Sequence, residues 1–397
     1  MKAVCIHRGE PLAPFGDPVA TLPVLNTPLA QAQEAALLRA GLQPCDTAPE
    51  GEPHLVYSDR TWFSAEAVRK LVAAGPGRIR VSDPGFLEAT TPLQDLAQPG
   101  VFELALHPGD GTPFDALPPV EVDLELEDAD FPDPHPKLRH AIRPVRVGLA
   151  QVHQIDHWSH LLRVNHLALS VMGQELKEDF LGAPWWKKLA GATRILGKAR
   201  SIEPSALAAA ITVRGDDAKI HPTAVVEASQ VGPGAEIGAH AVVRGAIVGP
   251  GARIEEHTTV LGSILGTRAI VARYAMCNFC VVMDEGQVSS GSGWQFSLVG
   301  RQAFIAFGST GLDLSFGGPI KVAHRGERVS SGHHLLGVCI GHGAVIGNGV
   351  RLHHGVAVPN EAVVVASADD LLRYPDLPPE AGPFVVEGGR LVPVRRG

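Results

Sequence analysis

Branched apolar residues recur at every fifth or sixth position between residues 219 and 288. The series comprises Ile220, Val226, Val231, Ile237, Val243, Val248, Ile254, Val260 and Leu265. The steps of 6, 5 and 6 add up to a period of 17 residues, which places Ile220, Ile237 and Ile254 in one column. Continuing the count predicts inward positions as far as Val282. Because no 3.6-residue helical face matches these steps, the pattern predicts short strands.

The residues around these apolar positions are small. Glycine often follows directly, and alanine often stands four positions later: Gly232, Gly238, Gly249 and Gly266, and Ala224, Ala235, Ala241, Ala252 and Ala269. This is the hexapeptide pattern of a parallel β-helix, in which each unit supplies one short strand and one corner of a thin triangular prism. We expect the alanines to fit beside the inward side chains. We expect the glycines to provide the positive φ of tight corners.

A second run has steps of six and consists of Ile340, Ile346, Leu352, Val358 and Val364. Residues 283–336, between the runs, break the period and are aromatic and rich in glycine and serine. Two interpretations of this insertion stay open: irregular coils with long excursions, or a loop that reaches over a neighbouring subunit. The two runs together resemble the hexapeptide-repeat superfamily. That resemblance implies a left-handed β-helix and assembly as a homotrimer.

Residues 1–150 alternate between strand and helix patterns. The strand candidates are KAVCIH, HLVYSD, RIRVSD, FELALH and VEVDLELE, and the helix candidates are PLAQAQEAALLRAGL and SAEAVRKLVAAG. Such alternation predicts an α/β domain. Residues 151–205 carry apolar positions at helical spacing, which predicts a helical linker. The β-helix would then occupy residues 206–370, followed by a C-terminal tail over 371–397.

Three segments of this front half resemble sugar-1-phosphate nucleotidyltransferases. They are PVLNTPLAQAQEAALLRAGL (23–42), LVYSDRTWFSAEAVRKLVAAG (55–75) and DHWSHLLRVNHLAL (156–169). The resemblance implies that Asp59 is the ligand of a catalytic Mg²⁺. However, the loop HRGEPLAPFGDPVATLPV lacks the family's glycine-rich phosphate cradle, and Val19 stands where the family has lysine. Three prolines in the loop lack the N–H groups that such a cradle needs. We therefore predict a degenerate, truncated nucleotidyltransferase-like domain.

Composition narrows the function classes. A net charge of −8 argues against nucleic acid as the main partner, because phosphates require a basic face. No apolar run reaches the ~18–20 residues that span a bilayer, and the N-terminus lacks the apolar stretch of a signal peptide. Five scattered cysteines do not form a disulfide framework. We expect a cytoplasmic protein.

Some candidate sites have plain structural interpretations. His153, His157 and His160 stand at helical spacing and could offer imidazoles to a metal, or form a polar helix face at a domain junction. Cys277 and Cys280 resemble half a zinc site, but Cys277 falls in the inward column, which predicts a core filler. His240 and His257, with Thr223 and Tyr274 in the same column, are expected to form a surface ladder without chemistry.

The segment KVAHRGERVSSGHHLLGVCIG places basic residues and histidines directly before the second run. It resembles the acetyltransferase half of the bifunctional N-acetylglucosamine-1-phosphate uridyltransferase. The resemblance implies transfer from acyl-CoA, most simply acetyl-CoA, with a histidine as general base at a subunit interface. The candidates for the base are His324, His333, His334, His353 and His354, with His333 or His334 preferred. Those for binding the cofactor are Lys321, Arg325 and Arg328.

The leading hypothesis is an acyl-CoA-dependent acyltransferase that acts on a sugar or nucleotide sugar, with the acyl-CoA bound along the coils between subunits. One alternative is a sugar-1-phosphate nucleotidyltransferase that uses Mg²⁺ and Asp59. A second alternative is a non-catalytic trimeric scaffold or sensor that kept the fold and lost both reactions.

Overall fold

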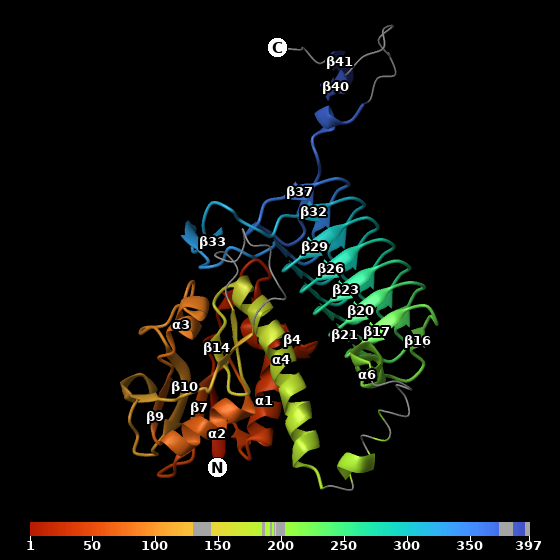
Figure 1. The fold of residues 1–397 in the computed structure, drawn as a ribbon. Helices are drawn as coiled ribbons and strands as arrows, with labels where there is room; N and C mark the ends of the chain where they lie inside the picture. Colours follow the sequence, from red (N-terminus) through yellow and green to blue (C-terminus); the bar gives the residue numbers. More distant parts are fainter. Residues whose placement is uncertain are drawn as a thin grey trace.

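A computed structural model describes residues 1–129, 144–184, 187–190, 193, 195, 203–372 and 384–393. An α/β domain and a left-handed parallel β-helix lie side by side, with the long helix α4 (Trp158–Gly182) between them (Figure 1). Both parts of the predicted fold class are therefore present. Within the described residues, no helix combines the length and apolar character needed to cross a membrane.

The strands of the β-helix stack into one parallel sheet on each side of a triangular prism. The covered face, which packs against α4, contains β15 (Val213–Arg214), β18 (Gln230–Val231), β21 (Ile247–Val248), β24 (Ile264–Leu265), β27 (Val281–Val282), β30 (Leu298–Val299), β35 (Cys339–Ile340) and β38 (Ala357–Val358). The charged face contains β16 (Lys219–Ile220), β19 (Glu236–Ile237), β22 (Arg253–Ile254), β25 (Ile270–Val271), β28 (Gln287–Val288), β31 (Phe304–Ile305), β36 (Val345–Ile346) and β39 (Val363–Val364). The third face contains β17 (Val225–Glu227), β20 (Val242–Arg244), β23 (Thr259–Leu261), β26 (Met276–Asn278), β29 (Gly293–Gln295), β32 (Thr310–Gly311) and β37 (Arg351–Leu352).

The predicted columns are confirmed as the core of this prism. Val231, Val248 and Leu265 pair in register on successive coils and are almost fully buried. The second run continues the same columns, because Ile340 pairs with Val299 and Ile346 with Ile305. Each inward side chain therefore meets its equivalent on the neighbouring coil, which is how a solenoid buries a continuous apolar core.

Trp294 fills an inward position that holds valine or cysteine in the coils before it. Its side chain is fully buried, and the position one coil later is Gly311. A Cβ added at Gly311 would lie 2.9 Å from an atom of the Trp294 ring. A glycine therefore makes room for the indole, as close packing of a narrow core requires.

The glycines that follow the inward residues allow close approach of the next coil and do not supply the expected positive φ. Gly232, Gly249 and Gly266 do not have positive φ. Instead, a Cβ at Gly249 would stand 2.6 Å from the carbonyl carbon of Gly266, and one at Gly266 would stand 2.5 Å from the amide nitrogen of Asp284. The expectation of positive φ at these positions was wrong, because close approach of the next coil excludes a side chain there. Positive φ occurs at other corners, including His240 and His257.

The break in the repeat is shorter than the expected insertion 283–336. Regular strands continue through β28, β29, β30, β31 and β32, and the coil is left after Gly311 and resumed at Cys339. The apolar period is not recognisable in the sequence of these coils, because Trp294 and Gly311 occupy inward positions that branched residues usually hold. The excursion carries the hairpin of β33 (Lys321–His324) and β34 (Glu327–Ser330), which lies above α3 in Figure 1.

The α/β domain is built on a mixed sheet of order β11-β9-β10-β7-β1-β6. Its strands are β1 (Lys2–Ile6), β6 (Gln43–Cys45), β7 (His54–Ser58), β9 (Gly77–Arg80), β10 (Val101–His107) and β11 (Pro119–Glu121). β1 runs parallel to β6 and β7, whereas β10 runs antiparallel to β7 and β9. Smaller pairs are β2 (Pro11–Leu12) with β3 (Asp17–Pro18), β4 (Pro23–Val24) with β5 (Thr27–Pro28), β8 (Thr61–Phe63) with β14 (Val152–Gln154), and β12 (Glu127–Ala129) with β13 (Val145–Val147).

The helices of this domain agree with the predicted segments. They are α1 (Leu29–Arg39), α2 (Ala65–Ala74) and α3 (Pro84–Thr90), with the short 3₁₀ turns Val19–Thr21 and Phe114–Ala116. Ser64 caps α2 by accepting the N–H of Ala67, and its hydroxyl also accepts the N–H of Gln151. Asp83 caps α3 by accepting the N–H of Phe86.

The outward residues of the covered face form one apolar cluster with α4 and the β4–β5 hairpin. Ile264 and Leu298 of the β-helix are fully buried in this cluster, as is Leu161 of α4. Asn165, in the middle of α4, accepts the N–H of Leu25 and donates to carbonyl oxygens, so the helix and the hairpin are held together by polar contacts as well. The first half of α4 is therefore a buried layer between the two domains, whereas residues 176–182 are exposed.

The proline-rich loop between β1 and α1 contacts the β-helix. Asp17 lies 2.7 Å from an Arg301 nitrogen and 3.1 Å from Nε2 of His342. Asn360 donates to the carbonyl of Phe15, whose ring packs on His342. The proline-rich loop thus joins the two domains.

The two ends of the β-helix differ. The short helix α6 (Pro204–Ala210) packs against β17 at its beginning. At its other end, the 3₁₀ turn Ala368–Asp370 leads away, and the hairpin of β40 (Phe384–Glu387) and β41 (Arg390–Pro393) stands apart from the two domains (Figure 1).

Candidate functional site

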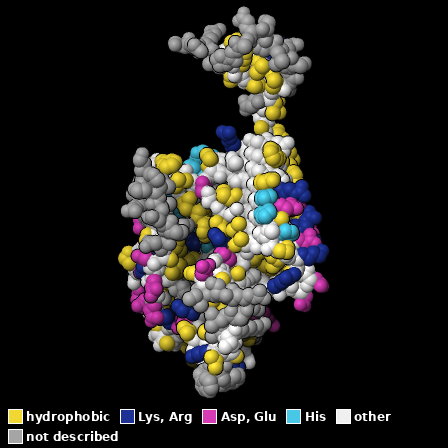
Figure 2. Space-filling model, turned by 45° about the vertical axis from the view of Figure 1, so that its right-hand side comes forward, with side chains coloured by type: hydrophobic (Ala, Val, Ile, Leu, Met, Phe, Trp, Pro, Cys, Tyr) yellow, Lys and Arg dark blue, Asp and Glu magenta, His cyan; other side chains and the backbone are white. Residues whose placement is uncertain are grey.

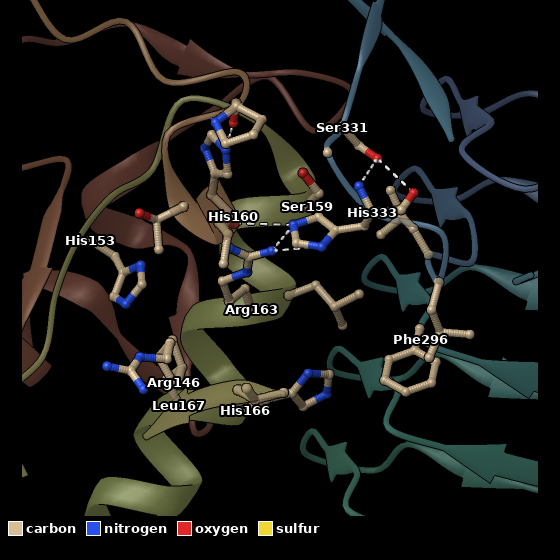
Figure 3. A pocket seen from close by; sticks show the side chains of 18 of the residues that line it. Arg146, His153, Ser159, His160, Arg163, His166, Leu167, Phe296, Ser331 and His333 are labelled. Carbon is tan, nitrogen blue, oxygen red and sulfur yellow. Dashed lines mark hydrogen bonds between the residues drawn. The ribbon is translucent and has the colours of Figure 1, made fainter. Parts of the chain in front are cut away.

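A cavity of about 250 Å³ opens where the α/β domain, α4 and the β-helix meet. The α/β domain contributes α3 and β14, and the β-helix contributes two corners and the excursion after β32 (Figure 3). Its lining residues are Phe86, Ala89, Thr90, Pro92, Pro144, Val145, Arg146, His153, Ser159, His160, Leu162, Arg163, His166, Leu167, Phe279, Phe296, Ser331, Gly332, His333, His334, Leu335 and Leu336. The cavity therefore joins segments that are far apart in the sequence.

One stripe of α4 forms a wall of this cavity. Ser159, Arg163 and His166 lie on successive turns, and Leu162 and Leu167 lie beside them. Residues three and four apart share a helix face, so this stripe turns toward the cavity as one surface. The opposite side of α4 carries Leu161 into the apolar cluster.

Arg163 brings a positive charge to the α4 wall of the cavity. Its Nη2 is in hydrogen-bond contact with Nε2 of His333, and burial lowers the pKa of Arg163 to about 10. The same edge of His333 lies 3.1 Å from the carbonyl oxygen of Ala89. His333 thus lies between α4 and α3. Its Nε2 accepts an N–H of Arg163 when it carries no proton and donates to the Ala89 carbonyl when it carries one.

His334 has a defined tautomer. Its Nδ1 lies 3.2 Å from the carbonyl oxygen of Ser315. Since a carbonyl oxygen can only accept, Nδ1 carries the proton and Nε2 keeps a lone pair. The half-buried ring lines the cavity, and an imidazole fixed in this way is suited to accept a proton from a bound hydroxyl or amine.

His166 stands against a pair of stacked aromatic rings. Phe279 and Phe296 occupy the same corner of successive coils, with ring centroids 5.0 Å apart and nearly parallel planes. The ring of His166 meets both edge-on. Burial lowers the pKa of His166 to about 4, a hydrogen bond to the Phe279 backbone opposes that shift, and Nε2 has no partner among the described residues.

The three histidines near the start of α4 do not share a helical face. His153 lies in β14, and His157 is the N-cap of α4, so His160 alone lies within the helix. Both ring nitrogens of His160 are occupied: Nδ1 accepts the N–H of Asp156, and Nε2 lies 2.9 Å from the Pro92 carbonyl. Burial lowers the pKa of His153 and of His157 to about 3, so both are neutral.

The shared helical face on which both the metal and the polar-face interpretations depended was wrong, whereas the expected position at the domain junction fits. His157 closes the junction by facing the Ala323 carbonyl of the excursion, 3.3 Å from its Nε2. Across the described residues, no group of three or more histidine, cysteine, aspartate or glutamate side chains is arranged to hold a metal ion.

His324 and Arg325 lie at the tip of the β33–β34 hairpin, where they meet the α/β domain. Nε2 of His324 lies 3.7 Å from a carboxylate oxygen of Asp95, and Arg325 pairs with the other oxygen. The ring of His324 packs on that of His157. These two predicted site residues therefore fasten the excursion to the α/β domain and do not line the cavity.

The other predicted residues lie on the outer side of the hairpin. Lys321 and Arg328 are exposed and share one side of its two strands, since Ala323 pairs with Arg328 and Lys321 with Ser330. Among the residues described here, neither has an ion-pair partner within 4.0 Å. The His353 and His354 ring centroids lie 3.8 Å apart with their planes tilted. Burial, then His353 and then the charge of Arg328 lower the pKa of His354.

Asp59 lies at the carboxyl ends of the parallel strands β1 and β7. Its carboxylate accepts the N–H of Arg8 at 3.1 Å and lies 3.5 Å from Nδ1 of His7. Arg8 in turn pairs with Glu103. Crevices at the carboxyl ends of parallel strands are the usual ligand sites of open α/β sheets, but Asp59 is far from a complete metal shell on its own.

The remaining predictions about histidine and cysteine agree with the structure. The rings of His240 and His257 stack at 5.0 Å, and Tyr274 continues the stack at 5.1 Å. Figure 2 shows histidine side chains above one another on this flank of the β-helix, beside charged side chains. Cys277 and Cys280 are fully buried in the core.

Sequence reasoning missed Arg163, His166 and Arg146. The signal that could have found Arg163 is a single positive charge within the otherwise apolar stretch HLLRVNHLAL of a buried helix. No comparable signal marks Arg146, which pairs with Asp83 and Asp128 across the α3 and β12 edges.

No protein-family model matches this chain, and no curated protein matches it. Among solved structures, the chain is similar to the polysialic acid O-acetyltransferase OatWY at 16% sequence identity and a TM-score of 0.20. The similarity covers 47% of this chain and 92% of that one. We therefore argue the function from the chain's own residues.

Proposed function

We propose that this protein is an acyl-CoA-dependent acyltransferase that acts on a sugar or nucleotide sugar held in the cavity. The observation that carries the proposal is His334: a ring with a fixed Nε2 lone pair, in a cavity bordered by β-helix coils. Fold alone does not specify a reaction, so the proposal depends on this side chain. Of the two preferred histidines, His333 is less suited to act as a base because Arg163 and the Ala89 carbonyl engage its Nε2.

In the proposed reaction, Nε2 of His334 removes the proton from an acceptor hydroxyl or amine. The acceptor oxygen or nitrogen attacks the thioester carbonyl and forms a new bond to carbon. The carbon–sulfur bond then breaks, and the CoA sulfur leaves with the proton returned by the His334 imidazolium. The carbonyl of Ser315 keeps the imidazole in the required tautomer and stabilises its charged form.

The exposed pair Lys321 and Arg328 is the proposed site for CoA phosphates. The two cations share one side of the hairpin and have no carboxylate partner among the described residues, so they are available to a polyanion. Arg325 is assigned a structural role instead, because Asp95 neutralises it. Analytical ultracentrifugation measures whether the chain assembles as a homotrimer.

The test is acetyl transfer from acetyl-CoA to a panel of sugars and nucleotide sugars, followed by release of the free thiol. His334→Gln should lower kcat by about 100-fold or more, the scale of a lost general base. His240→Ala, which removes an exposed histidine of the far corner, is the matched control and should keep the wild-type rate. Equal rates for His334→Gln and the wild type would eliminate His334 as the base. No transfer to any acceptor would favour the scaffold hypothesis.

The Mg²⁺-dependent nucleotidyltransferase remains a second candidate because of the place of Asp59 at the β1 and β7 strand ends. Mg²⁺ is typically held by one or two carboxylates together with substrate phosphates, so Asp59 would be its protein ligand. Pyrophosphate release from a sugar 1-phosphate and each nucleoside triphosphate, lost in Asp59→Asn, would support this activity. The contacts of the loop carrying Asp17 and Phe15 with the β-helix argue for the acyltransferase first.

A further inference from the structure

Arg163 and Arg146 line the same cavity but differ in how their charges are balanced. Arg146 contacts two carboxylates, those of Asp83 and Asp128. Arg163 contacts the imidazole of His333, and no carboxylate among the described residues lies within 4.0 Å of its guanidinium. Within the part of the chain that the structure describes, the cavity therefore has one cation with carboxylate partners and one without.

The surroundings of Arg163 make its charge costly. The titratable side chains around it on α4 and β14 are His153, His160 and His166, whose pKa values are all lowered by burial and further by the charge of Arg163. From the excursion, His333 faces it. A buried charge without a counter-charge is expensive, and proteins normally pair it or bind a ligand to it. The missing partner is an anion.

A second polar atom in the cavity also lacks a partner. Nε2 of His166 is buried and without a hydrogen bond among the described residues. Because the ring is neutral and its hydrogen bond to the Phe279 backbone uses the other nitrogen, Nε2 can only accept. His166 stands one turn after Arg163 on the same stripe of α4. A ligand that contacts both therefore carries an anionic group and a hydroxyl or N–H donor.

The size and the walls of the cavity restrict the ligand further. A volume of about 250 Å³ lies just below the range of ~300–1,000 Å³ for drug-sized ligands, so one ring with its substituents fills it. The stacked rings of Phe279 and Phe296 and the side chain of Leu167 form apolar walls. Such walls suit the flat faces of a ring and strengthen a charge pair by excluding water.

We propose that this cavity binds a small hydroxyl-bearing acid, a sugar carboxylate or sugar phosphate, with its anionic group on Arg163 and a hydroxyl on Nε2 of His166. The proposal rests on the proposed function in that it takes this molecule as the acyl acceptor. His333 is a positioning residue, because it holds the guanidinium of Arg163 in place from the excursion.

The experiment measures binding to the full chain by isothermal titration calorimetry, without acetyl-CoA. The probes are glucuronate, glucose 6-phosphate and neutral glucose, so that the first two distinguish carboxylate from phosphate. We expect one of the two acids to bind and glucose not to bind. Arg163→Met should weaken that binding by about 10- to 100-fold, as loss of a charge-assisted hydrogen bond does. Lys177→Met, which removes an exposed cation of the same helix, should leave it unchanged.

Stability gives an independent readout. Arg163→Met should raise the Tm of the ligand-free protein, because an apolar side chain replaces an unpaired buried charge, and should abolish the Tm increase caused by the acid. Arg163→Lys keeps the charge and should retain part of the binding if Arg163→Met does not fold. His166→Phe should weaken binding without changing the preference for acids.

Failure of either acid to bind, or equal affinities for Arg163→Met and the wild type, would overturn the inference. Binding that depends on Arg163 together with no acetyl transfer would uphold it and refute the acyltransferase. Acetyl transfer to a neutral sugar with no dependence on Arg163 would uphold the acyltransferase and refute the binding inference.

Discussion

The β-helix and the junction around α4 differ in which residues their buried side chains contact. In the β-helix each inward residue meets its equivalent one coil away, as Val248 meets Val231 and Leu265. At the junction buried polar residues find partners far along the chain: Asn165 bonds to Leu25, and Arg163 contacts His333. Repetition produces a uniform apolar core in the β-helix, and buried histidines lie at the junction.

Because of this difference, the β-helix mainly contributes stability, whereas the junction contributes the candidate functional side chains. In a repeat, each coil places the same kind of side chain at the same position, so no single coil carries a distinct reactive side chain. The excursion after Gly311 and the stripe on α4 are free of that constraint, and they supply His333, His334 and Arg163 to the cavity. The same substitution should therefore have different consequences in the two regions.

The largest expected difference comes from adding one methyl group. Gly249→Ala in the β-helix places a Cβ 2.6 Å from backbone atoms of Gly266, so a coil must shift and stability should fall by about 3 kcal/mol. Gly173→Ala in α4 meets nothing within 4 Å and should stabilise the helix by about 0.5–1 kcal/mol. Urea unfolding of both variants checks the pair. Similar effects at the two sites would break the comparison.

The next effect is acid sensitivity, which we expect to arise at the junction. His153 and His157 have pKa values of about 3, and His166 of about 4, against 6.5 when unfolded. Below pH 6.5 these histidines bind protons in the unfolded chain but stay neutral in the folded chain. The free energy of unfolding therefore falls as the pH falls toward 4. Each such group contributes about 1.4 kcal/mol per pH unit.

Asp156 acts in the opposite sense, since burial raises its pKa from 3.8 to about 6 and the folded state binds its proton first. This carboxyl offsets one of these histidines, and the pKa of His160 is lowered as well, so acid should still destabilise the protein. Urea unfolding at pH 7 and pH 5 measures the slope, which His153→Leu should reduce and the exposed His240→Ala should not. A slope that His153→Leu leaves unchanged would place the acid sensitivity elsewhere.

The smallest effect concerns the contact between the proline-rich loop and the β-helix. Asp17→Asn keeps the shape of the side chain but removes the charge that faces Arg301 and His342. Because these groups are partly exposed, the free energy of unfolding should fall by about 1 kcal/mol or less. Limited proteolysis of the loop should accelerate, whereas proteolysis within the coils should not. Equal acceleration in both regions would show that the loop does more than join the domains.

How much of the fold the sequence predicts depends on the range of its contacts. The columns through Ile237, Val248 and Val260 could be predicted because each strand repeats after 17 residues. Such a regular spacing is recognisable in the sequence itself. Helices α1 and α2 were readable for the same reason at 3.6 residues. The coils containing Trp294 and Gly311 were missed, because a large residue and a glycine compensate each other only across neighbouring coils.

The candidate site was less readable. The sequence identified His333 and His334 as chemistry-bearing residues, and the structure places both at the cavity. It grouped them with His324, which the β33–β34 hairpin places against His157, and with His353, which follows β37 and contacts His354. Nearness in sequence therefore does not place these histidines in one site.

The sequence by itself determined the prism, the alternating α/β domain and the pool of histidines and cations, because periodicity and composition are properties of neighbouring positions. The tertiary structure alone decided which cations stay unbalanced. It gave Arg146 two carboxylates and Arg163 an imidazole, since ion pairs form between residues that packing brings together from distant parts of the chain.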